Sequence, residues 1–178
     1  MKVIAVYNLK GGVGKTSMAV NLAALSASRS SRRTLLWDLD AQRAASFLIG
    51  DDKVSPGQAL SIFDKSAKIG KSARASRLDN VDIIGADGSL RDIAAYLDGG
   101  IGKRRMTKLI FDLEKSYDRL ILDCAPGLDS LTDQILRAAD IVIVPVIPSP
   151  LSERAFDEVV AHVRGHFGKK EKVSLLPV

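Results

Sequence analysis

The chain has 178 residues, of which 46% are hydrophobic and 26% are charged, and its formal net charge is +5. This length favours one domain with a real core, and the composition is ordinary for a soluble globular protein. No apolar run reaches the roughly 18 residues that span a bilayer, residues 2–7 are too short for a signal peptide, and the single Cys124 excludes an internal disulfide. We therefore expect a cytoplasmic protein with no evident membrane segment. The positive charge permits a polyanionic partner without identifying one.

Apolar runs rich in β-branched residues alternate with helical patterns along the chain. We expect strands at residues 2–7, 34–40, 81–87, 118–124, 140–146 and 172–178, and helices at 16–28, from about 55, at 89–98, 103–117, 131–139 and 150–164. Apolar strands separated by helices indicate an α/β fold, with a mostly parallel sheet and helices on both faces. Ligands of such sheets bind at the carboxyl ends of the strands, where polar stretches follow at 8–16, 38–42 and 123–127.

The first polar stretch belongs to the segment YNLKGGVGKTS, residues 7–17. Glycines at 11, 12 and 14 let the backbone curl around phosphates, and the following helix points its N-terminal N–H groups at the anion. Lys15 would supply charge at the β and γ phosphates, and Thr16 a hydroxyl for Mg²⁺. A glycine turn that binds nothing is the alternative. The strand, the loop, the Lys-Thr pair and the helix occur together, so the segment predicts a nucleotide site.

Carboxylates end two neighbouring apolar runs and complete this expectation. Asp123 ends one strand and could hold Mg²⁺, whereas Asp38 and Asp40 end another. Alternate strand residues point the same way, so both of the latter carboxylates could face the phosphates. One could support the metal shell and the other could position the attacking water. Two acids that merely cap a turn are the alternative interpretation.

These segments resemble the ParA/MinD family of deviant Walker A P-loop ATPases, and most closely the small ParA-type partition proteins. LKGGVGKTS looks like the deviant Walker A motif, WDLDAQRAAS like the switch I segment, and LILDCAPG like the Walker B segment. IVIVPVIPSPLSERAFDEV also resembles ParA proteins. The resemblance covers nearly the whole chain and implies a P-loop NTPase fold.

The resemblance implies a Mg²⁺-dependent ATP hydrolase that forms an ATP-dependent homodimer with its nucleotides at the interface. Lys10, the extra lysine, would reach the partner's ATP and act in catalysis with Lys15 and Asp40, the acid that orients water. A solvated loop lysine is the alternative for Lys10. Thr16, Asp38 and Asp123 would form the metal site. The implied nucleotide-binding residues are Lys10, Gly11, Gly12, Val13, Gly14, Lys15, Thr16 and Ser17.

The same resemblance implies partition of plasmid or chromosomal DNA. The ATP-bound dimer would bind DNA non-specifically at the nucleoid, and a ParB-type centromere-binding adaptor would stimulate hydrolysis. Ala41 and Ala125 stand where the family usually has proline, which we expect to alter kinetics rather than binding. We expect residues 1–178 to form one P-loop ATPase domain that stops short of the family's usual C-terminal segments, which help to hold adenine.

Two basic segments are candidates for DNA contact. Residues 65–78 contain Lys65, Lys68, Lys71, Arg74 and Arg77 without an acid, and their Ser and Gly content suggests a mobile loop or frayed helix. The second segment is Lys103, Arg104 and Arg105, which would lie at the positive end of a helix dipole. That place is unfavourable for cations and suggests another purpose, such as contact with DNA, with a partner or with the second subunit of the dimer. Solvated surface charge is the alternative for both segments.

Three other functions are weighed against partition. A MinD-like or cargo-positioning ATPase would act on a membrane or a protein assembly. A metabolic P-loop ligase of the dethiobiotin synthetase type would need a small-molecule pocket, which the sequence does not reveal. An iron–sulfur reductase is disfavoured because Cys124 stands alone.

Overall fold

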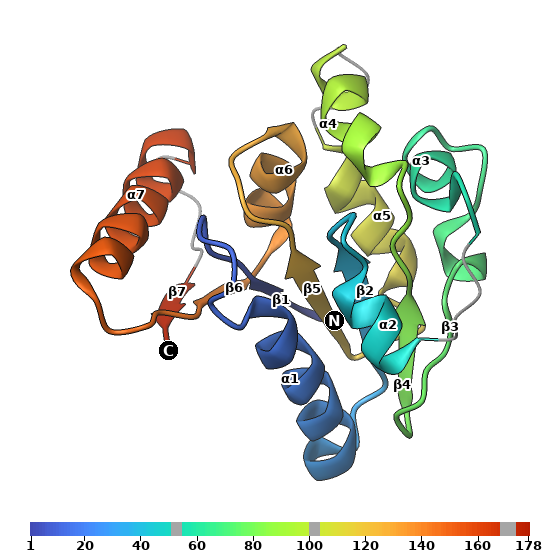
Figure 1. The fold of residues 1–178 in the computed structure, drawn as a ribbon. Coiled ribbons are helices and arrows are strands. Elements are labelled where there is room, and N and C mark those ends of the chain that lie inside the picture. The colour runs from blue at the N-terminus through green and yellow to red at the C-terminus, as the bar shows by residue number, and fades with distance from the viewer. Residues whose placement is uncertain (51–54, 100–103, 168–173) are drawn as a thin grey trace.

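The computed structural model describes residues 1–50, 55–99, 104–167 and 174–178 (Figure 1). Its strands are β1 (Lys2–Val6), β2 (Thr34–Leu39), β3 (Arg74–Ala75), β4 (Val81–Ile84), β5 (Arg119–Cys124), β6 (Ile141–Val144) and β7 (Ser174–Pro177). Its helices are α1 (Lys15–Ser30), α2 (Ala44–Ile49), α3 (Gln58–Phe63), α4 (Leu90–Asp98), α5 (Arg105–Leu113), α6 (Ser130–Ala138) and α7 (Pro150–Phe167), with a 3₁₀ turn η1 at Ile69–Lys71. No helix within these ranges is long and apolar enough to cross a bilayer.

The strands form one sheet in the order β3-β4-β2-β5-β1-β6-β7. Every neighbouring pair is parallel except β3 and β4, which are antiparallel. The register aligns the ends of the central strands, because Val6 of β1 and Asp38 of β2 both pair with Asp123 of β5. The predicted mostly parallel sheet and P-loop fold are therefore confirmed, and the predicted polar stretches meet at one edge of the sheet.

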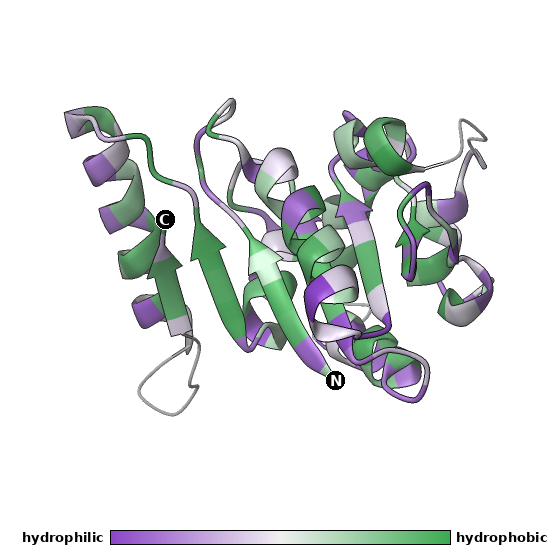
Figure 2. Cartoon of the chain, turned by 90° about the horizontal axis from the view of Figure 1, so that it is seen from below, coloured by the Kyte–Doolittle hydropathy of each residue, from purple (hydrophilic) through white to green (hydrophobic). Residues whose placement is uncertain are grey.

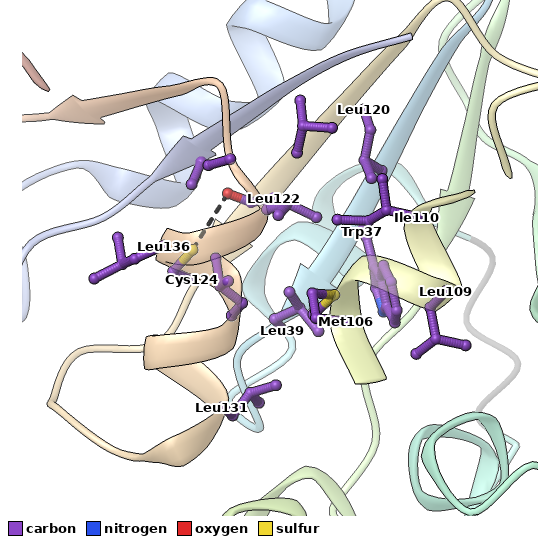
Figure 3. Packing of buried hydrophobic residues seen from close by; sticks show 14 of the residues in the cluster. Trp37, Leu39, Met106, Leu109, Ile110, Leu120, Leu122, Cys124, Leu131 and Leu136 are labelled. Atoms are coloured by element: carbon purple, nitrogen blue, oxygen red, sulfur yellow. Dashed lines mark hydrogen bonds between the residues drawn. The ribbon is translucent and has the colours of Figure 1, made fainter. Parts of the chain in front are cut away.

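Helices cover both faces of the sheet, as predicted, but the two cores differ in size. Buried residues of α3, α4, α5, α6 and α7 pack on one face with Trp37 and Leu122 of the sheet, as Figure 3 shows in part. On the other face, α1 and α2 bring mostly small side chains, among them Ala19, Ala23 and Ala45. Alanines let these helices lie close to the strands. Figure 2 shows the strands as mainly hydrophobic, with hydrophilic residues toward the ends of some of them.

The basic segment 65–78 differs from its prediction as a mobile loop or frayed helix. It contains the turn η1 and the short edge strand β3. Ile69 is buried in the larger core, and Ser72 is also buried. These two residues lie between the cations in the sequence and anchor the segment to the rest of the fold. The lysines and arginines of this segment are all exposed. A charged edge strand of this kind also discourages pairing with other chains.

Candidate nucleotide-binding site

The glycine loop joins β1 to α1 with a backbone that needs glycine at two positions. Gly12 has φ 74° and Gly14 has φ 91°, which is the left-handed region that side chains rarely adopt. A Cβ atom added at Gly11, Gly12 or Gly14 would meet no heavy atom within 4 Å. The loop is therefore an open cradle, and the N-terminus of α1 begins directly after it at Lys15. Open backbone at a helix N-terminus is the arrangement that binds phosphate.

Two buried residues before the loop fix its position, and sequence reasoning assigned neither a role. The Asn8 side chain donates from Nδ2 to the Pro145 carbonyl at 2.7 Å and accepts at Oδ1 from the Lys10 N–H at 3.0 Å. The Tyr7 hydroxyl donates to the Gly127 carbonyl at 2.8 Å. These bonds tie the loop to the segments that follow β6 and β5. The signal that could have found Asn8 is an amide placed directly after an apolar strand.

The two loop lysines occupy different environments. Lys15 is only 7% exposed, and its Nζ donates to the carbonyl of Lys10 at 2.7 Å. Burial lowers the pKa of Lys15, and the negative charges of Asp40 and Asp123 oppose that change. Lys10 is partly exposed, and its ammonium group makes no hydrogen bond or ion pair to the part of the chain that the structure describes. Lys15 therefore belongs to the interior of the site, whereas Lys10 stands at its margin.

Asp123 is a fully buried carboxylate at the end of β5. Neither of its oxygens has a hydrogen bond of normal geometry within the described residues. Burial raises the pKa of Asp123 from 3.8 to about 7, and the negative charges of Asp38 and Asp40 add to the rise. The nearby Thr16 hydroxyl and the positive charge of Lys15 lower this pKa and so offset part of the rise. Free, buried carboxylate oxygens beside a hydroxyl fit Mg²⁺, which takes oxygen ligands from one or two carboxylates, phosphates and water.

Asp38 is also fully buried, and all its hydrogen bonds are local. Its Oδ1 accepts from the Asp40 N–H at 3.1 Å, and its Oδ2 accepts from the N–H and the hydroxyl of Ser46 at 2.8 and 2.6 Å. Burial raises the pKa of Asp38, and the Ser46 bonds oppose the rise. Asp40 is partly exposed and accepts from the Gln42 N–H at 2.8 Å. Both acids thus bond to the turn after β2, Asp38 bonds also to α2, and their metal and water roles stay predictions.

The fold brings Lys15, Asp38, Asp40 and Asp123 close enough to interact electrostatically. The charges of Asp40 and Asp123 raise the pKa of Lys15, and those of Asp38 and Asp40 raise the pKa of Asp123. No group of three or more His, Cys, Asp or Glu side chains is placed to hold a metal by itself among the residues that the structure places. A cation at Asp123 would therefore need oxygens from a phosphate or water as well, as Mg²⁺ sites usually have.

A cavity of about 630 Å³ lies elsewhere, between α4, α5 and α6. It is lined by Leu97, Arg104, Thr107, Ser130, Asp133, Gln134 and Arg137. None of the predicted nucleotide residues belongs to its walls. The chemistry proposed from the sequence is therefore centred on the open loop and not on this cavity.

The second basic segment does not form the predicted surface cluster. Lys103 lies outside the described residues, and Arg104 is exposed immediately before α5. Arg105 is only 9% exposed, and its guanidinium donates to the Phe63 carbonyl at 2.8 Å and to the Ile62 carbonyl. The expectation that Arg105 contacts DNA is therefore wrong, because its charge caps the last turn of α3, where carbonyl groups carry partial negative charge.

Comparisons with known proteins agree with this geometry. A family model described as an AAA domain (AAA_31) matches residues 1–173. The sporulation initiation inhibitor protein Soj of Bacillus subtilis is 35% identical over 147 residues, which are 82% of this chain and 58% of Soj. The chromosome partitioning protein ParA of Myxococcus xanthus is 34% identical over 148 residues, which are 82% of this chain and 52% of that protein. The chain thus spans a little over half the length of these relatives.

Solved structures extend the similarity to almost the whole chain. McdA of Cyanothece without nucleotide has a TM-score of 0.88 at 22% identity, over 99% of this chain and 70% of McdA, which shows the shared fold. Cobyrinic acid a,c-diamide synthase of Mycobacterium smegmatis, with a bound ATP analogue and magnesium, has a TM-score of 0.83 at 26% identity, over 99% of this chain and 72% of the synthase. Because the family model spans residues 1–173 and both Soj and ParA are more than 30% identical over 82% of this chain, the chain belongs to the ParA/MinD family of P-loop ATPases.

Proposed function

We propose that the chain is a Mg²⁺-dependent ATPase that dimerises with ATP and partitions DNA. The observation that carries the proposal is the separation of the two loop lysines. Lys15 is buried beside Asp40 and Asp123, whereas the ammonium of Lys10 has no partner within the described chain. A cation at the margin of an open phosphate cradle is free to serve a nucleotide held by a second copy.

Each predicted site residue has a task in this proposal. Residues 10–17 hold the phosphates, and Lys15 places its charge at the β and γ positions. Thr16 and Asp123 hold Mg²⁺, which when bound supplies charge neutralisation at the phosphates. Asp38 supports this site from the adjacent strand, and Asp40 orients the attacking water. Lys10 of the second copy stabilises charge on the transferred phosphoryl group, as an arginine finger supplied in trans does, with an effect of about 10³–10⁵ in rate.

DNA is the proposed cargo. The ATP-bound dimer would bind the DNA of the nucleoid, in the cytoplasm, without sequence preference. The relative named as a chromosome partitioning protein supports this assignment. Exposed Lys65, Lys68 and Lys71 line a groove of about 600 Å³ against α5, and phosphate contacts need cations rather than base-reading side chains. A ParB-type adaptor would stimulate hydrolysis and so release the DNA. An ATPase that acts at a membrane is distinguished by binding to vesicles instead of DNA, and one that acts on a protein assembly would bind that assembly instead.

Mixing two inactive variants tests the proposal. Lys10→Ala and Asp40→Ala are each expected to bind ATP and to hydrolyse it very slowly. In a mixed dimer, one site takes Lys10 from one subunit and Asp40 from the other, so that site is intact. Phosphate release should therefore return on mixing. Mixed dimers that are confirmed by pull-down and still release no phosphate would show that Lys10 does not act in trans.

A metabolic P-loop ligase is the second candidate, and the similarity to cobyrinic acid a,c-diamide synthase favours it specifically. That enzyme class couples ATP to a small acceptor, so its turnover should not respond to DNA or to a DNA-binding adaptor. The cavity between α4, α5 and α6 would be the place to look for the acceptor. ATP turnover measured with and without duplex DNA and the adaptor separates the two functions.

A further inference from the structure

Ser46 is a buried junction behind the two switch acids. It is 5% exposed and lies in α2, which directly follows the turn that carries Asp40. Its N–H and its hydroxyl both donate to Oδ2 of Asp38, at 2.8 and 2.6 Å. The same hydroxyl accepts from the backbone N–H of Ala86 at 2.8 Å. The hydroxyl therefore uses its donor on the carboxylate and its acceptor on the segment after β4, so its orientation is fixed from two sides.

A second contact joins the same two segments. Arg43, at the start of α2, donates from Nε to the carbonyl of Ala86 at 3.1 Å. Its backbone N–H donates to the Asp40 carbonyl at 2.8 Å. Arg43 has φ 61°, a left-handed conformation that is uncommon for a residue with a side chain. Both backbone polar groups of Ala86 are thus bonded to the switch segment, the N–H to Ser46 and the carbonyl to Arg43.

The packing around Ser46 leaves its hydroxyl little freedom. A Cβ atom added at Gly85 would lie 3.3 Å from Ser46 Oγ, tighter than most contacts of real Cβ atoms. Ala86 and Asp38 are both buried. Movement of Ser46 would therefore move Asp38 and, through the Asp38–Asp40 hydrogen bond, the turn that carries Asp40.

We propose that Ser46 is a positioning residue for nucleotide hydrolysis, which holds Asp38 and the Asp40 turn against the end of β4. This role rests on the proposed ATPase function and adds to it a residue outside the predicted nucleotide-binding and metal-binding sets. Ser46 acts through the two acids, so it should govern the rate of the chemical step and leave the binding of MgATP largely unchanged. Hydrogen bonds to charged groups contribute about 1.5–3 kcal/mol, which corresponds to roughly 10- to 100-fold in rate.

Steady-state hydrolysis and calorimetric MgATP binding are measured on four variants of the full chain. Ser46→Ala is expected to lower kcat by about 10- to 100-fold with KM and Kd changed less than about threefold. Ser46→Thr keeps the hydroxyl and should restore most of the rate. Gly85→Ala removes no polar group but presses on Ser46 Oγ, so it should lower kcat by several-fold. Gly88→Ala is the matched control, because a Cβ atom there meets nothing within 4 Å.

The outcomes separate this role from the proposed function. Equal kcat values for wild type and Ser46→Ala would overturn the positioning role and leave the ATPase function standing. A loss of kcat in Ser46→Ala that comes with an equal loss of MgATP affinity would also overturn it, since that pattern indicates collapse of the binding site. A wild-type protein that neither binds nor hydrolyses MgATP would overturn both. Thermal melting of each variant ensures that rates are compared on folded protein.

Discussion

Replacing Asp123 with asparagine is expected to stabilise the nucleotide-free protein, and increasingly so as the pH rises. The carboxylate is fully buried and has no hydrogen-bond partner of normal geometry within the described residues. Burial raises its pKa from 3.8 to about 7. The folded protein therefore binds the proton of the Asp123 carboxyl group more tightly than the unfolded chain does. Between the two pKa values, each rise of one pH unit lowers the free energy of unfolding by about 1.36 kcal/mol.

The direction of the effect follows from that difference. Stability from this residue is greatest below about pH 4 and falls as the pH rises toward 7, after which the penalty of a buried charge is constant. Between pH 5.5 and 8, integration gives a loss of about 2 kcal/mol in the wild-type free energy of unfolding from Asp123 alone. Asparagine at this position does not titrate. The free energy of unfolding of Asp123→Asn, relative to that of the wild type, should therefore increase by about 2 kcal/mol between pH 5.5 and 8.

Urea unfolding at both pH values, without nucleotide or Mg²⁺, measures this change. Asp157→Asn is the control, because Asp157 is exposed on α7 and its removal should alter stability little at either pH. With MgATP the order should reverse, since a bound cation stabilises the charged carboxylate and the asparagine variant loses that contribution. A difference between wild type and Asp123→Asn that does not vary with pH would refute the reasoning.

Three further predictions concern charged residues. Lys15→Ala should lower ATP affinity in calorimetry by more than about 100-fold, because a buried charge at the phosphates is lost, and unchanged affinity would place the site elsewhere. Arg105→Ala should lower the free energy of unfolding by about 2–3 kcal/mol in urea and leave DNA affinity unchanged, since its guanidinium bonds the end of α3. Joint replacement of Lys65, Lys68 and Lys71 by alanine should flatten the slope of log K against log salt for duplex DNA by up to about 2.7 units; an identical slope would make them ordinary surface lysines.

Much of the fold was predictable because its signals are local. The apolar runs that predict strands coincide with β1, β2, β4, β5, β6 and β7, and their ends place the polar stretches at one edge of the sheet. The glycine loop was predictable for the same reason, since the left-handed φ values of Gly12 and Gly14 require the residue type that the sequence shows. Separation by helices was enough to predict parallel pairing, because a crossover is what joins parallel strands.

The remainder depends on tertiary contacts that no short window contains. α2 has six residues, too few for a helical period to be recognised, and Arg43 at its start gives no side-chain capping signal. Arg105 looks like its basic neighbours in the sequence, and only the end of α3 beside it explains its burial. Asn8 and Ser46 likewise gain their roles from partners at residues 145 and 86, far along the chain.

The features that work against stability lie close together at the carboxyl ends of the central strands. Asp123 is a buried acid without a hydrogen-bond partner of normal geometry in the described chain, Lys15 is a buried cation, and Arg43 has a left-handed backbone. Each disfavours the fold by itself, and groups of this kind concentrate at functional sites. The acids and Lys15 already lower one another's penalty, but the acids outnumber the cation and raise each other's pKa. A divalent cation would offset the negative charge of the acids, and the glycine loop at the N-terminus of α1 would hold the phosphates bound to that cation. The instability of the site and its proposed ligand therefore have one physical explanation.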